Sequence, residues 1–173
     1  MARVFIGVGS NIHPEENVPK AVRLLGRETR IKAISTFYLT EPVGGTGQPL
    51  FYNGVVEIET EIPPVKLKHS VLRRIENELG RKRVADKYAA RTIDLDMLIY
   101  DDLVATTKDL VIPDPQISSR AFLAIPLNEL APDLVLPGSG RPIREVAQAL
   151  AGHTMQPLSE FTKRLRREIE SGS

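Results

Sequence analysis

The sequence predicts an α+β domain with a mainly antiparallel sheet. Three observations support this class: apolar runs of strand length, amphipathic stripes of helix length between them, and Gly, Pro and polar residues at the boundaries. The predicted elements follow the order strand, helix, strand, strand, helix, strand. This β-α-β-β-α-β order is that of a ferredoxin-like core with its helices on one face of the sheet, and here a C-terminal extension follows it.

The first predicted elements are a buried strand, a turn and a helix. Residues 3–8 predict the strand, and residues 9–11 predict a polar turn after it. Apolar residues at helical spacing between positions 18 and 25 predict the helix. Because Pro19 is tolerated only in the first turn of a helix, we place the helix start near Asn17.

The next predicted elements are two strands and a second helix. Residues 31–39 and 55–62 predict the strands, and the second strand has one acidic face. A Pro-Pro pair precedes the helix, which ends at Gly80, a residue type that is common at helix C-caps. Its apolar stripe repeats at every fourth residue and consists of Leu67, Val71, Ile75 and Leu79. Beyond Tyr100 the pattern weakens, and we expect only short elements.

The length and composition are those of one globular domain. The chain has 173 residues, of which 42% are hydrophobic and 26% are charged, and this composition excludes wholesale disorder. A chain of this length is too short to divide comfortably into two cored domains. We therefore expect residues 1–160 to form a single domain. Residues 161–173 are expected to form a charged C-terminal tail, as a frayed or solvated helix.

The composition also excludes several kinds of site and partner. The chain has no cysteine, which excludes disulfides, thiolate catalysis and cysteine-bound metals. No apolar run approaches the roughly 20 residues that span a bilayer, and the amino terminus has no charged leader. We therefore expect a cytoplasmic protein without membrane contact. The net charge of +1 gives no overall attraction to nucleic acid.

The most informative segment is a predicted strand that carries two aspartates. Asp94 and Asp96 share one face of residues 91–100, and the other face takes Ile93, Leu95, Met97 and Ile99. At about 3.3 Å per residue the aspartate backbones lie roughly 6.6 Å apart, so their carboxylates can converge on two divalent cations about 3.5–4 Å apart. The hard oxygen ligands favour magnesium over zinc. For such a pair taken alone, the alternative is an ordinary solvent-facing strand edge.

A run of cations precedes this strand. Five positive charges fall within eleven residues, at Arg81, Lys82, Arg83, Lys87 and Arg91. Alone, such a run is usually a solvated surface. Beside paired carboxylates it supplies cations for phosphate oxygens next to ligands for magnesium, as nucleoside triphosphate chemistry requires. The chain has no Walker-type or kinase-type glycine-rich loop, so a triphosphate would be held in another way.

The aspartate segment resembles the signature of the 6-hydroxymethyl-7,8-dihydropterin pyrophosphokinase family of folate synthesis. The signature is an Arg, two residues, an Asp, a hydrophobic residue, a second Asp and two hydrophobic residues, and residues 91–98 match it. Further family landmarks occur in family order between residues 3 and 150. They are Gly9-Ser10-Asn11, Ser35 to Tyr38 with Thr40, Gln48-Pro49, Asn53, Gly80 to Arg83, Arg120-Ala121-Phe122, and Pro126 to Pro132.

The resemblance implies transfer of the β,γ-diphosphate of ATP to the hydroxymethyl oxygen of a reduced pterin, with release of AMP. It implies ATP as co-substrate and two Mg²⁺ ions held by Asp94 and Asp96. The other residues that it implies in catalysis and ATP binding are Arg81, Arg83 and Arg91, with Arg120 as a further ATP contact. Those that it implies in pterin binding are Thr40, Val43, Phe51, Asn53, Tyr88, Asp94 and Phe122. Phe51 and Phe122 would stack on the pterin, and core packing is the alternative for these two rings.

Two positions depart from the family pattern. Before the aspartates the family often has Trp-Gly-Pro-Arg, where this chain has Tyr88-Ala89-Ala90-Arg91, so only an aromatic cover is kept. After the next strand the family commonly has Pro-His, with the His touching phosphate, where this chain has Pro113-Asp114. An aspartate there would repel a phosphate oxygen unless it turns away, takes a proton or joins the outer shell of a metal.

Two other functions stay open at the level of sequence. Ferredoxin-like sheets often present aromatic and basic side chains to single-stranded RNA, although near-neutral charge and the lack of an RNP aromatic signature argue against such a module. A relative that binds pterin but has lost catalysis through Asp114 is the second alternative. Beyond ATP and pterin we expect neither nucleic acid nor membrane as a partner, and other folate-pathway enzymes are candidate partners.

Overall fold

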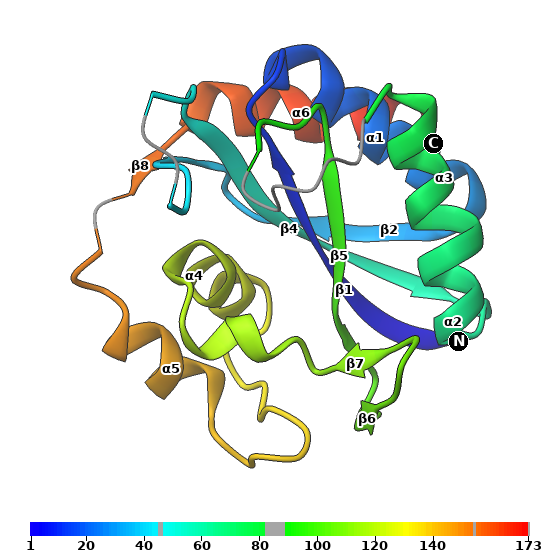
Figure 1. The fold of residues 1–173 in the computed structure, drawn as a ribbon, viewed down its shortest axis with the longest axis vertical. Helices are drawn as coiled ribbons and strands as arrows, with labels where there is room; N and C mark the ends of the chain where they lie inside the picture. Colours follow the sequence, from blue (N-terminus) through cyan, green and yellow to red (C-terminus); the bar gives the residue numbers. More distant parts are fainter. Residues whose placement is uncertain (45–46, 82–88, 154, 173) are drawn as a thin grey trace.

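The computed structural model describes residues 1–44, 47–81, 89–153 and 155–172. Its centre is a sheet in which β5, β1, β4, β3 and β8 lie in that order and β2 also pairs with β4 (Figure 1). The described pairings of this sheet are antiparallel, which confirms the predicted α+β class. The strands are β1 (Ala2–Ser10), β2 (Arg30–Ile34), β3 (Tyr38–Thr40), β4 (Phe51–Thr60), β5 (Asp94–Tyr100) and β8 (Gln156–Pro157).

Helices cover both faces of the sheet (Figure 1). One face carries α1 (Pro14–Glu28), α6 (Ser159–Ser171) and a continuous helical segment made of α2 (Pro64–Lys66), the π-helical η1 (Leu67–Leu72) and α3 (Arg73–Glu78). The other face carries α4 (Ala121–Leu130) and α5 (Ile143–Ala149) over a second core. The two helices of the predicted core thus share one face, and α4 and α5 of the C-terminal extension cover the opposite one.

Short elements connect β5 to α4, as the weak pattern beyond Tyr100 predicts. They are the strand pair β6 (Ala105–Thr106) and β7 (Val111–Ile112) and the 3-10 helix η2 (Pro115–Ser118). Among the helices in the described part of the chain, none combines the length and the apolar character that crossing a membrane requires.

Helix α1 begins three residues before the position that the sequence predicts. His13 takes a left-handed conformation with φ of 44°, and the helix starts at Pro14 instead of near Asn17. Pro19 therefore lies inside the helix rather than in its first turn, where it removes one backbone donor. The helix tolerates this because Val18, Pro19 and Leu25 are buried against the sheet, so tertiary packing outweighs the local preference.

A register shift in β5 corrects the predicted faces of this strand. Leu95 and Met97 face the larger core, as predicted, but Ile99 lies in the second core with Leu98. The cause is an irregularity in the pairing with β1, where Phe5 pairs with Ile99 and the next residue pairs with Met97. One extra residue in a strand moves every following side chain to the other face of the sheet.

The strand predicted at residues 31–39 is interrupted by a bulge. Ile34 pairs with Val56 and Tyr38 pairs with Asn53, so residues 35–37 stand opposite only two residues of β4. Ser35 stays on β4 through its backbone, because its N–H donates to Val55 O at 2.9 Å. The side chain of Phe37 is fully buried over Gly54, where an added Cβ atom would lie 2.5 Å from the Phe37 ring.

The C-terminal segment packs more closely than a solvated tail would. Residues 161–171 form most of α6, whose charged residues are largely exposed. However, Phe161, Thr162 and Leu165 are buried, and Phe161 and Leu165 belong to the larger core. Phe161 and Leu165 are four residues apart and therefore lie on one face of the helix, which packs beside α1. Helix α6 is thus exposed on one face and packed against the core on the other.

Candidate active site

The site is built on a row of residues that crosses four neighbouring strands. Asp94 of β5 pairs with Gly9 of β1, and Gly9 pairs with Asn53 of β4. Asn53 in turn pairs with Tyr38 of β3. A Cβ atom on Gly9 would lie 2.5 Å from Asn53 Oδ1, so only glycine leaves room for this amide. Gly9 and Ser10 are therefore strand residues, and the prediction of a turn at residues 9–11 is wrong for these two.

Two arginines converge on Asp94. Arg81 Nη1 donates to Asp94 Oδ1 at 3.0 Å, and Arg91 Nη1 donates to Asp94 Oδ2 at 3.0 Å. The two arginine side chains are 14% and 17% exposed, so solvent screens these ion pairs less than it screens pairs on an open surface. The fold thus brings together three of the residues that the sequence assigned to catalysis, although Arg81 and Asp94 are thirteen positions apart.

A buried carboxylate holds Arg81 from a second side. Glu76 Oε2 of α3 accepts from Arg81 Nη1 at 2.5 Å and from the backbone N–H of Leu95 at 2.9 Å. Glu76 is only 4% exposed, so it fixes both the arginine and the strand backbone between the two aspartates. Sequence reasoning missed Glu76. The available signal was its place four residues after Leu72, which puts both side chains on the same inner face of the helix.

Negative charge is concentrated around Asp96. Loss of solvation is the largest cause that raises the pKa of Asp96 well above its usual range, and repulsion from Asp94, Asp114 and Glu76 adds to it. Asp96 keeps an exposed surface, so a cation can reach the carboxylate that these neighbouring charges crowd. For Arg81 burial acts to lower the pKa, but Asp94 and Glu76 outweigh it and the pKa is raised. A cation beside Asp96 would relieve the repulsion.

Asp114, which stands where the family commonly has His, belongs to the same electrostatic environment. Its Oδ1 accepts from the backbone N–H of Gln116 at 2.9 Å and so caps η2. Burial raises the pKa of Asp114, the hydrogen bond from Gln116 lowers it, and the charge of Asp94 raises it, with a net increase. Asp114 therefore lies close enough to the aspartates for their charges to repel one another.

Asn11 connects the two chain segments that flank the row. Its Oδ1 accepts from the N–H of Arg91 at 2.8 Å, and its own N–H donates to Arg91 O at 3.2 Å. Its Nδ2 donates to Gln48 Oε1 at 3.3 Å and to Pro49 O at 3.2 Å. Since Asn11 is only 3% exposed, these bonds tie the segment before β5 to the loop before β4.

Two of the predicted pterin contacts touch each other. Asn53 Nδ2 donates to Thr40 Oγ1 at 2.7 Å. Phe51 pairs with Thr40 across β3 and β4, and an atom of its ring lies 3.9 Å from the position of a Cβ atom on Gly9. Thr40, Phe51 and Asn53 therefore form one edge of the site, next to the row that carries Asp94.

The remaining predicted residues come from the surrounding loops and from α4. Val43 is partly buried in the loop after β3, and Phe122 packs partly buried against the second core. Arg120 precedes α4, and its Nε is buried without a hydrogen-bond partner among the described residues. Arg83 and Tyr88, like the other basic residues at 82 and 87, lie outside the described residues.

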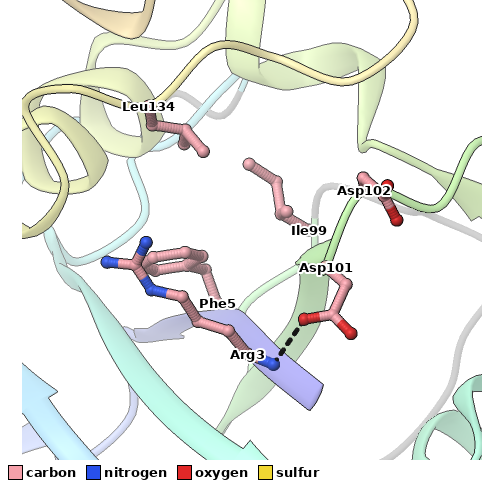
Figure 2. A pocket seen from close by; sticks show the side chains of 6 residues that line it. All are labelled: Arg3, Phe5, Ile99, Asp101, Asp102 and Leu134. Atoms are coloured by element: carbon pink, nitrogen blue, oxygen red, sulfur yellow. Dashed lines mark hydrogen bonds between the residues drawn. The ribbon is translucent and has the colours of Figure 1, made fainter.

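A hollow of about 400 Å³ lies at the opposite end of β1 and β5 (Figure 2). Its lining includes Arg3, Phe5, Ile99 and Asp101. The Arg3 guanidinium lies 5.0 Å from the centre of the Phe5 ring, and Asp101 Oδ1 accepts from the N–H of Arg3 at 2.7 Å. Of the residues assigned to catalysis that the structure describes, none lines this hollow, so it is separate from the aspartate site.

The match to a family model decides the assignment of the chain. Residues 5–132, from β1 to just beyond α4, match the model for 7,8-dihydro-6-hydroxymethylpterin-pyrophosphokinase (HPPK). The chain belongs to this family. HPPK transfers pyrophosphate from ATP to hydroxymethyldihydropterin in folate synthesis, so the predicted family and the predicted class, a diphosphotransferase, are confirmed.

Named relatives match most of this chain. The 2-amino-4-hydroxy-6-hydroxymethyldihydropteridine pyrophosphokinase of Haemophilus influenzae is 38% identical over 162 residues, which cover 92% of this chain and 99% of the relative. The protein of the same name from Pseudomonas aeruginosa is 38% identical over 150 residues, which cover 85% and 91%. Wild-type HPPK-DHPS of Plasmodium falciparum matches 86% of this chain in structure, with a TM-score of 0.67 and 13% identity. This chain spans 44% of that longer chain, and at such identity the likeness concerns the fold alone.

Proposed function

We propose that this HPPK chain transfers the β,γ-diphosphate of ATP as one unit to the hydroxymethyl oxygen of 6-hydroxymethyl-7,8-dihydropterin, that AMP leaves, and that Asp94 and Asp96 hold two Mg²⁺ ions. The reaction follows from the family. The observation that carries the site assignment is the convergence of Arg81 and Arg91 on Asp94, next to the crowded carboxylate of Asp96. Cations and carboxylates in one place are what phosphoryl transfer requires.

The carboxylates of Asp94 and Asp96 suit magnesium better than a metal whose ligands all come from protein side chains. Among the described residues no group of three or more His, Cys, Asp or Glu side chains converges on a metal position. Mg²⁺ usually keeps several waters and is held by one or two carboxylates together with substrate phosphates. Two aspartates on one strand face, with excess negative charge around them, match that mode of binding.

The protein groups supply orientation and charge. When bound, Mg²⁺ would neutralise the phosphates and make the pterin hydroxyl easier to ionise. Arg81 and Arg91 offer planar donors that can move from Asp94 to phosphate oxygens. The Nε of Arg120, which has no hydrogen-bond partner in the described part of the chain, is a further donor that an anion would satisfy. Asn53 and Thr40 would bind the amide edge of the pterin, and Phe51 and Phe122 its faces.

The direct test of the function is turnover of the wild-type protein. We expect AMP and a pterin diphosphate in equal amounts when the protein is mixed with ATP, magnesium and the hydroxymethyl dihydropterin. Binding of the pterin without release of AMP would instead identify a catalytically impaired relative. Retention on single-stranded RNA without either activity would favour the RNA-binding alternative.

Free magnesium should control the rate beyond its role in forming MgATP. With MgATP saturating, we expect turnover to rise as free Mg²⁺ is added and to be abolished by a chelator, because a second ion would have to occupy the aspartates. The measurement is the rate of AMP formation against free Mg²⁺ at constant MgATP. A rate that is already maximal at one magnesium per ATP would contradict the two-ion proposal.

Neutralising Asp114 should improve ATP binding. We expect Asp114→Asn to lower the KM for ATP about fivefold, because a like charge near phosphate costs on the order of 1 kcal/mol at partly solvated sites. Asparagine can still accept from the N–H of Gln116, so the cap of η2 is kept. Asp133→Asn, at an exposed aspartate after α4, is the matched control. An unchanged or increased KM would show that the carboxylate of Asp114 does not oppose the nucleotide.

We also propose enzymes of folate synthesis as partners, since one solved relative carries HPPK and DHPS in a single chain. Nucleic acid and membranes are not proposed as partners. A cytoplasmic location stays a prediction from the sequence.

A further inference from the structure

We infer that Arg166 and Thr162 of α6 are positioning residues for the pterin-binding edge, although neither belongs to the site itself. The two side chains hold the backbone of the bulge at residues 35–37, and this bulge sets the place of β3 against β4. The inference rests on the proposed pterin contacts of Thr40 and Asn53.

The bulge leaves the sheet, so its backbone polar groups need partners from elsewhere. Buried N–H and C=O groups without a partner are costly, and in a regular strand β4 would satisfy them. Ser35 still bonds to Val55 through its N–H, and its Oγ accepts from the N–H of Val55 at 2.9 Å. The backbone groups of the residues before and after Ser35 bond instead to side chains of α6 and α4 and to the backbone of the segment before α6.

Arg166 and Glu129 brace the start of the bulge. Arg166 donates to Ile34 O through Nε at 2.9 Å and through Nη2 at 2.7 Å. The same Nη2 lies 3.3 Å from Glu129 Oε2 of α4, and both oxygens of Glu129 accept from the N–H of Thr36, at 2.9 and 3.2 Å. One arginine and one carboxylate therefore join α6, α4 and the bulge.

Thr162 and the end of β8 hold the other side of the bulge. Thr162 Oγ1 accepts from the N–H of Phe37 at 2.9 Å and donates to Leu158 O at 2.9 Å. The N–H of Leu158 donates to Phe37 O at 2.8 Å, next to the pairing of β8 with β3. Thr162 is only 2% exposed, so water does not compete for these bonds. Both backbone groups of Phe37 are thus satisfied by the C-terminal segment.

The bulge is coupled to the pterin edge by direct packing. The Phe37 ring lies against the Cα atom of Gly54, which is the residue after Asn53. Tyr38, the residue after Phe37, pairs with Asn53, and two residues later Thr40 accepts the side-chain bond of Asn53. A shift of Phe37 therefore moves both residues that are proposed to read the amide edge of the pterin. The arginine cluster around Asp94 lies across β1 and does not share these contacts.

This geometry separates a positioning role from a merely structural one. If α6 only stabilised the fold, loss of a bond would lower the melting temperature and leave the kinetic constants of the folded enzyme unchanged. If α6 positions the pterin edge, the KM for the pterin must rise while the KM for ATP stays the same. A single hydrogen bond is worth about 0.5–1.5 kcal/mol, which corresponds to roughly a 2- to 12-fold change in KM.

The test compares two variants with two matched controls in the full chain. Thr162→Val removes the hydroxyl at nearly constant shape, and Thr162→Ser keeps it. Arg166→Gln removes the guanidinium from a half-exposed position, and Arg167→Gln removes the same charge from an exposed position one residue further along α6. We expect Thr162→Val and Arg166→Gln to raise the KM for the pterin about 2- to 12-fold with an unchanged KM for ATP. Thr162→Ser and Arg167→Gln should behave as wild type.

Wild-type constants for both folded variants, or equal increases in both KM values, would overturn the inference. If Thr162→Val does not fold, Arg166→Gln decides alone, because its side chain is partly exposed and can be replaced without opening a cavity. A different result would show that the proposed pterin contacts of Thr40 and Asn53 are themselves wrong. In that case Asn53→Ala would leave the KM for the pterin unchanged, or the wild-type protein would form no product at all.

Discussion

We expect Asp96→Asn to reduce turnover roughly 100- to 10,000-fold, because a metal that stabilises transition-state charge is worth several kcal/mol and each 1.36 kcal/mol is a factor of ten in rate. Asparagine has nearly the same shape as aspartate, but it lacks the charge that would hold Mg²⁺. The variant should stay folded, since the native carboxylate is repelled by Asp94, Asp114 and Glu76. Removing one charge from such a group relieves repulsion.

Asp102→Asn is the control for this prediction. Asp102 is an exposed aspartate beside the hollow at the opposite end of β5 (Figure 2). The substitution removes the same charge from the same chain and should leave kcat unchanged. The assay is the rate of AMP formation at saturating ATP and pterin, with circular dichroism to establish that both variants are folded. Near-normal turnover of Asp96→Asn would mean that the carboxylate takes no part in the reaction.

The second large effect concerns stability, and it depends on the buried pair of Arg81 and Glu76. Their side chains are 14% and 5% exposed, and Nη1 and Oε2 are 2.5 Å apart. Arg81→Gln would leave the buried charge of Glu76 without this arginine. Removing one partner of such a buried ion pair typically lowers the free energy of unfolding by about 3–5 kcal/mol. We therefore expect the free energy of unfolding of Arg81→Gln, measured with urea, to fall by about 3 kcal/mol.

A second substitution should recover part of this loss. In the double variant Arg81→Gln/Glu76→Gln the buried charge is gone, and the amide oxygen that replaces the carboxylate of Glu76 can still accept from the N–H of Leu95. Replacing both members of a buried pair is often far less costly than replacing one. We expect the double variant to be more stable than Arg81→Gln by at least about 1 kcal/mol. If the double variant is less stable than Arg81→Gln, the buried charge is not the source of the cost.

Much of the fold could be predicted because it depends on local patterns. The stripe from Leu67 to Leu79 and the alternation of β4 reflect one side of each element facing a core, and such periodicity is visible in sequence. The start of a helix and the irregularities within strands were harder to predict. The start of α1 depends on the left-handed conformation of His13, and the bulge at residues 35–37 depends on Gly54 making room for Phe37. Neither leaves a periodic signal.

The candidate site was predictable where its residues lie on or next to one strand. Asp94 and Asp96 share a face because strand geometry leaves no other choice, and Arg91 is close to them in the chain. The contribution of Glu76 was not predictable in the same way, because its bond to Leu95 joins α3 to β5. The same is true of Arg166 and Glu129, which meet through the tertiary packing of α6 beside α4 and the bulge. Contacts between distant segments are set by packing, which a single sequence does not display.

The central claim is that the carboxylates of Asp94 and Asp96 hold magnesium against the phosphates of ATP. The most direct measurement is a crystal structure with Mg²⁺, an inert ATP analogue and the hydroxymethyl dihydropterin. We expect metal ions within about 2.1 Å of oxygens from both aspartates, with the analogue's phosphates completing the coordination. Electron density that places both carboxylates in solvent, with no ion beside either of them, would contradict the claim.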